Sequence, residues 1–209
     1  MAKMKLNKKL NLVFPIEVES GVAYVHSMSV SREVFEMNYL VLSMTFMEIY
    51  GKRLGPIMGP RVAYYLLRDQ ALSLTPKPEN NQSIDPDEDV WGKTQKTLIQ
   101  EIYRLTTIIV PTEDKYDTIP YIQAKQQKIL DEDQIMEVEN AIVYFTVASH
   151  LHQKSELSMA YAGLERTYNA QTISLNVTEY MNSLPTLTKE ENTGETTTAQ
   201  APKVSRKVF

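Results

Sequence analysis

The 209-residue chain contains no cysteine, which excludes disulfides, thiolate zinc sites, iron–sulfur clusters and cysteine nucleophiles. It has only 7 glycines, and neither a glycine-rich phosphate-binding loop nor a Gly-x-Ser-x-Gly motif is present. No run of apolar residues approaches the length of a membrane span, so we expect no membrane association. The net charge of −4 argues against nucleic-acid binding.

Two pairs of potentially reactive side chains have the wrong spacing for chemistry. His150 and His152 are two residues apart, so on a helix they point to different faces and cannot close one metal site; we expect both at the solvent edge. Glu137 and Glu139 diverge in the same way, and only Glu139 leans toward an apolar stripe, where a structural hydrogen bond is favoured over acid–base catalysis. The sequence therefore predicts no catalytic residue, no cofactor and no metal.

The apolar pattern predicts a mainly α fold, a helical bundle with a short N-terminal β-hairpin and a flexible C-terminal tail. Two runs rich in Val, Leu, Tyr and Phe, residues 10–16 and 22–28, flank a turn that contains Gly21. Asp131, with Gln134 three residues later, begins the segment with the clearest helical spacing. The expected helices are residues 32–50, 61–72, 91–107, 121–130, 132–151, 156–166 and 175–184, with residues 108–110 either a helix end or a brief extended piece.

Composition divides the chain into three parts. Residues 1–9 form a lysine-rich extension, residues 10–185 form the mostly helical domain, and residues 186–209 form a polar tail. Within the domain, a proline-rich and acidic stretch near residues 75–90 is expected to be a mobile loop. The tail has the composition of a segment that stays disordered without a partner.

The predicted helix over residues 32–50 is apolar on more than one face. A helix of this kind is buried on two sides, and in a small domain one side is available to a partner. Methionine thioethers adapt to varied surfaces, although filling gaps in the core explains them equally well. The predicted partner-binding residues are Met37, Met44, Met47, Phe46 and Tyr50.

Several stretches carry a resemblance to a known class of proteins. These are residues 10–16, 23–27, 31–36, 137–145 and 170–180. In overall pattern over about residues 10–185, the chain resembles the tail assembly chaperones of long-tailed bacteriophages, which open with a short β segment, continue as helices and end in a polar tail. The chain is longer than many members, and its lysine-rich start and Val-Phe ending match no feature of them.

The resemblance implies a non-enzymatic protein of phage tail morphogenesis. Such chaperones bind tape-measure and tail-tube subunits in the host cell cytoplasm, and many have a longer form made by ribosomal frameshifting. Self-association into a homo-oligomer is also expected. One alternative is a virion structural protein, a head–tail connector or minor tail component that forms rings with neighbouring virion subunits; another is an uncharacterised enzyme.

Overall fold

A computed structural model describes residues 10–74, 93–153, 155–185 and 187. The structure is 58% helical and 20% strand, and its strands form one five-stranded antiparallel sheet in the order β4-β3-β2-β1-β5. The prediction of a mainly α helical bundle is therefore wrong. The predicted extension at residues 1–9, the loop near residues 75–90 and the tail at residues 186–209, apart from residue 187, lie outside the described residues.

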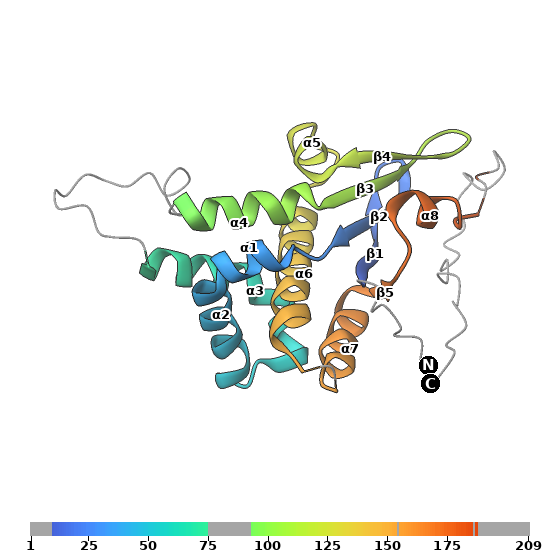
Figure 1. Ribbon diagram of the computed structural model, residues 1–209. Coiled ribbons are helices and arrows are strands. Elements are labelled where there is room, and N and C mark those ends of the chain that lie inside the picture. The colour runs from blue at the N-terminus through green and yellow to red at the C-terminus, as the bar shows by residue number, and fades with distance from the viewer. Residues whose placement is uncertain (1–9, 75–92, 154, 186, 188–209) are drawn as a thin grey trace, which may run out of the picture.

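The elements alternate between sheet and helices along the chain (Figure 1). In order they are β1 (Asn11–Val18), β2 (Gly21–Met28), α1 (Arg32–Met37), α2 (Tyr39–Gly51), α3 (Gly55–Leu74), α4 (Lys93–Arg104), β3 (Thr106–Pro111), β4 (Tyr116–Pro120), α5 (Tyr121–Gln126), α6 (Glu132–Leu151), α7 (Leu157–Tyr168), β5 (Gln171–Ile173) and α8 (Val177–Met181).

The predicted hairpin is present as β1 and β2. These strands pair from Asn11–Met28 to Val18–Gly21, and Gly21 takes a positive φ of 121° at the turn, a conformation that favours glycine. A two-stranded hairpin is marginal alone. Here it lies at the centre of the sheet, because β3 pairs with β2 and β5 pairs with β1.

Each face of the sheet has its own apolar cluster. Because side chains alternate along a strand, Leu12, Phe14 and Val25 point into the main core with the helices, whereas Val13 and Tyr24 point to the opposite face. A smaller cluster covers that opposite face, and its buried members are Val13, Tyr24, Ile109, Ile173, Tyr180 and Leu184. In Figure 1, α8 lies over this side of the sheet. The C-terminal segment is therefore part of the fold up to Leu184.

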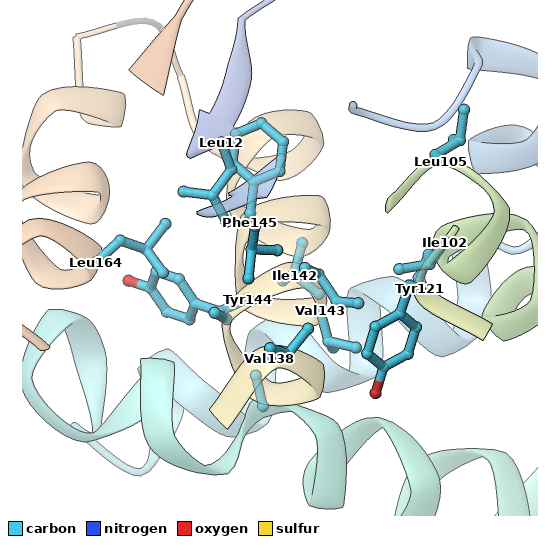
Figure 2. Packing of buried hydrophobic residues seen from close by; sticks show 14 of the residues in the cluster. Leu12, Ile102, Leu105, Tyr121, Val138, Ile142, Val143, Tyr144, Phe145 and Leu164 are labelled. Atoms are coloured by element: carbon cyan, nitrogen blue, oxygen red, sulfur yellow. The ribbon is translucent and has the colours of Figure 1, made fainter. Parts of the chain in front are cut away.

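Helix α6 is the centre of the main core. Its N-terminus is closed by the predicted capping box, in which the Asp131 carboxylate and the Gln134 side chain each accept a backbone N–H at 2.8 Å. Every residue from 138 to 148 is buried. Figure 2 shows Phe145 beneath Leu12 of β1 and Val143 beside Tyr121 of α5. A helix buried on all sides needs partners around its whole circumference.

Two predicted boundaries in the helical part are wrong. The single helix expected over residues 32–50 is broken at Asn38, whose side-chain amide donates to the Val34 carbonyl at 2.8 Å. The helix expected over residues 61–72 begins earlier, at Gly55, and Pro60 lies inside it. Because Pro60 has no N–H, the Pro56 carbonyl lacks its regular helical donor.

Helix α7 contacts α3 where Gly163 lies against Pro56. A Cβ atom on Gly163 would lie 2.3 Å from the Pro56 carbonyl oxygen, closer than any real contact. The two backbones therefore touch only because residue 163 has no side chain. The hydroxyl of Tyr168, later on α7, donates to the Pro60 carbonyl at 2.7 Å, so the same helix pair is also joined by a hydrogen bond.

We predict that Gly163→Ala lowers the free energy of unfolding by about 2–3 kcal/mol, since the added methyl group forces two packed helices apart. Urea unfolding monitored by circular dichroism measures this change. Gly51→Ala is the matched control, because nothing lies within 4 Å of a Cβ at that position; its stability should stay within about 0.5 kcal/mol of the parent or rise slightly. Equal effects of the two substitutions would contradict the contact.

Candidate functional site

Helix α2 has a buried side and an apolar side that faces solvent. Leu42, Thr45 and Ile49 are buried on the side that meets α3 and α6. On the opposite side, Leu40 and Met47 are 58% and 70% exposed. We define the α1–α2 surface as Met37, Leu40, Met44 and Met47. The last three share one face of α2 by their spacing of four and three residues, and Met37 precedes them at the bend between the helices.

The structure separates the five predicted partner-binding residues into two groups. Met37 is 62% exposed and Met47 is 70% exposed, and Met44 is half-buried on the same surface. Phe46 and Tyr50 point elsewhere and are half-buried. Their rings pack 4.6 Å apart, and the Tyr50 hydroxyl lies 2.8 Å from that of Tyr144 on α6. These two aromatic residues hold α2 on the core and do not belong to the exposed surface.

Two histidines at the end of α6, His150 and the C-cap residue His152, contact aromatic side chains of α1 and α2. The His152 side chain is only 4% exposed, and its ring lies 4.9 Å from that of Phe46 and 4.6 Å from that of Tyr50, edge to face with both. His150 stacks on Phe35 of α1 at 4.9 Å. The expectation that His152 lies at the solvent edge is therefore wrong. Both histidines instead anchor the α1–α2 segment to the end of α6.

Glu139 is the centre of a polar cluster inside the core. It is 5% exposed, and its Oε1 accepts from the hydroxyls of Tyr103 at 2.7 Å and Tyr121 at 3.0 Å and from Nζ of Lys125 at 2.8 Å. These donors come from α4 and α5, which the cluster joins to α6. The structural hydrogen bond expected for Glu139 is present. Its three donors are scattered in the sequence and were not predicted.

The chemistry of this cluster favours a structural role. Burial raises the pKa of Tyr103 and of Tyr121 far above the ordinary value of 10, and the nearby charge of Glu139 raises both further. The two hydroxyls therefore stay protonated and keep donating to the carboxylate. Within the described part of the chain, no group of three or more His, Asp or Glu side chains has an arrangement that could hold a metal ion.

His26 lies on the other face of the sheet, under the C-terminal segment. Its side chain is fully buried, and Nε2 is 3.1 Å from the carbonyl of Leu175, to which it donates in the neutral tautomer. Burial lowers the pKa of His26 below its ordinary value of 6.5, and the hydrogen bond to Leu175 opposes this only in part. Burial beneath the segment before α8 therefore favours the uncharged imidazole of His26.

We predict that Glu139→Ala lowers the free energy of unfolding by about 2–3 kcal/mol, because two buried hydroxyls lose their acceptor. Thermal and urea unfolding measure the loss. Glu137→Ala, an exposed change on the same helix, serves as the control and should have little effect. Replacing Glu139 with Leu together with Tyr103→Phe and Tyr121→Phe should recover part of the loss, since the buried carboxylate and its two hydroxyl donors are then removed together. A Glu139→Ala variant as stable as the parent would contradict this role.

The lowered pKa of His26 predicts acid sensitivity. In the unfolded chain the imidazole takes up a proton near pH 6.5, whereas the folded chain resists protonation. The stability contributed by neutral His26 should therefore be complete above about pH 6.5 and decrease as the pH falls below that value. Urea unfolding at pH 5, 6, 7 and 8 should show this decrease for the parent and a flatter profile for His26→Gln. Parallel profiles for the two proteins would show that another group is responsible.

The described residues include no helix with the length and apolar character that crossing a membrane requires. Comparison with protein families, with curated proteins and with solved structures finds no match for this chain.

Proposed function

We propose that this chain is a non-enzymatic binding protein that holds another protein against its α1–α2 surface. The observation that carries the proposal is the exposure of Met37, Leu40 and Met47, each more than half exposed, within a short segment. Apolar side chains gathered in this way mark interaction sites more often than isolated ones do. Methionine and leucine fit apolar partners of varied shape, because the thioether side chain is flexible.

The interior of the protein supports binding over turnover. The buried carboxylate of Glu139 already accepts hydrogen bonds from Tyr103 and Tyr121, and it forms an ion pair with Lys125. These three donors bind Glu139 inside the cluster. The two tyrosines stay protonated because their pKa values are raised. A catalytic acid or base needs a group that is free to exchange a proton with a substrate.

The resemblance to tail assembly chaperones supplies the identity of the partner. On that basis the bound proteins are the tape-measure protein and tail-tube subunits of a long-tailed phage, and the site of action is the host cell cytoplasm during assembly. The tape-measure protein of such phages is a long chain that needs covering before the tail closes around it. An apolar surface on one helix fits the helix-in-groove and helix-on-helix modes of recognising such chains.

We predict that Met47→Asp abolishes partner binding without unfolding the protein. Met47 is 70% exposed, so the carboxylate stays in water in the free protein but becomes buried and unpaired in a complex. Co-purification with the co-expressed tape-measure protein of the same phage should fall about tenfold or more. Met159→Asp is the matched control, because Met159 is 55% exposed on α7, away from this surface.

The outcome separates the competing functions. A folded Met47→Asp variant that binds as the parent does would remove the α1–α2 surface from the proposal, and absence of binding by the parent to both tape-measure and tail-tube proteins would remove the chaperone function. Mass spectrometry of purified particles tests the alternative: a chaperone should be absent, whereas a connector or minor tail protein should be present in stoichiometric amount.

A further inference from the structure

Helix α3 has a second exposed face, distinct from the α1–α2 surface. Ala63, Leu67 and Ala71 are buried on its inner side, where it meets α2, α6 and α7. The opposite side consists of Met58, Arg61, Tyr65, Asp69 and Leu72, all of them exposed. Their spacings of three and four residues place all five on one face of the helix. We call these residues the α3 outer face.

The α3 outer face is symmetric in its apolar positions and opposite in charge on the two sides of its midpoint. Tyr65 is the midpoint. Arg61 and Asp69 lie four residues to either side of it with opposite charges, and Met58 and Leu72 lie seven residues to either side as apolar residues. The order is therefore apolar, positive, aromatic, negative, apolar. Met58, Tyr65 and Leu72 are 43%, 42% and 40% exposed, so the three apolar positions form an evenly spaced row.

Neither Arg61 nor Asp69 forms an ion pair or a side-chain hydrogen bond with another described residue. Some other exposed helical charges pair within their own helices, as Arg32 does with Glu36 and Arg104 with Glu101. Arg61 and Asp69 are eight residues apart on α3, about 12 Å along its axis, too far to pair with each other. A partner that presents a negative group near Arg61 and a positive group near Asp69 would satisfy both.

We propose that this partner is a second copy of the chain, packed with its α3 antiparallel to the first across a two-fold axis at Tyr65. The axis places Arg61 of each copy at the height of Asp69 of the other, and Met58 at the height of Leu72. Tyr65 meets its own counterpart at the centre. An isologous contact requires a surface that is complementary to itself. The outer face meets this requirement, because positions at equal distances from Tyr65 are alike in apolar character and opposite in charge.

The geometry of the face fits a pair of helices. Its apolar residues repeat every seven positions over about 21 Å of helix, the repeat at which two helices pack at a shallow crossing angle. Tyr65 is held in place from the side, because its hydroxyl lies 2.7 Å from Sδ of Met136 on α6. Met136 and Ile57, 38% and 62% exposed, widen the apolar area. One helix face buries a small area for a stable interface. We therefore expect a weak dimer, whose population rises with protein concentration.

Charge reversal tests the pairing. We expect the parent to shift from monomer to dimer with rising concentration in sedimentation velocity. Arg61→Asp alone and Asp69→Arg alone each place like charges opposite one another, and each should raise the dimer dissociation constant about tenfold or more. An equimolar mixture of these two variants should dimerise again, because one then carries two negative and the other two positive groups. The double variant Arg61→Asp with Asp69→Arg should also recover.

Two controls complete the design. Arg166→Asp makes the same charge change at an exposed position on α7 and should leave the dimer unaffected, and unchanged melting temperatures show that the variants are folded. Met47→Asp should also leave the dimer intact. A parent that stays monomeric at every concentration, charge-reversal variants that dimerise as the parent does, or a mixture that fails to associate would each overturn the proposal. Loss of the dimer through Met47→Asp would also overturn the proposal. A parent protein that is monomeric but still binds tail proteins would leave the proposed function unaffected.

Discussion

The burial of α6 on every side is the constraint on which the rest of the structure depends. Its residues 138–148 form an unbroken buried stretch, and no single neighbouring element can cover a helix all the way round. The sheet, α2 with α3, and α7 therefore each cover part of it, and they come from both halves of the chain (Figure 1). Burying apolar side chains from all these elements is the main favourable term, so the halves are expected to fold together.

Burial on all sides also requires that the polar groups of α6 find partners. The Asn140 side chain accepts the backbone N–H of Tyr64 at 3.0 Å and donates to the carbonyl of Met136 at 2.9 Å. Glu139 gathers donors from α4 and α5, and Thr146 donates to the Ile142 carbonyl. Each buried polar residue of α6 therefore bonds to a neighbouring element or to the backbone of its own helix. A buried polar group without such partners costs free energy, which is why these contacts also specify the arrangement of the elements.

The parts of the fold that could be predicted from sequence are those with local causes. The hairpin followed from its apolar runs and Gly21, and the start of α6 followed from the Asp131–Gln134 capping box. Strands β3 and β5 depend on pairing with the distant strands β2 and β1, and β4 joins the sheet only through β3. Strand β5 also has only three residues. Their cause is absent from their own sequence, and the predicted helical bundle was wrong for this reason.

The candidate surface follows the same division. Of the predicted partner-binding residues, Met37 and Met47 are exposed. Helical spacing could not set Phe46 and Tyr50 apart from them, because the contact that captures these two residues comes from His152, about a hundred residues later. The order of the α3 outer face was readable in the sequence, but a helix expected to begin only at residue 61 leaves out Met58 and hides the symmetry about Tyr65.

The described edges of the sheet add a reason why association should use helices. At the β4 edge, the N–H of Thr118 is bonded to the Asp117 carboxylate at 2.8 Å, and Pro120 has no N–H to offer. At the other edge, β5 is too short to template a long partner strand. Short edges, prolines and side chains that occupy backbone donors all oppose strand addition. Most of the large apolar side chains that stay exposed in the described residues lie on α1, α2 and α3, and contacts made through them leave the sheet and the core around α6 unchanged.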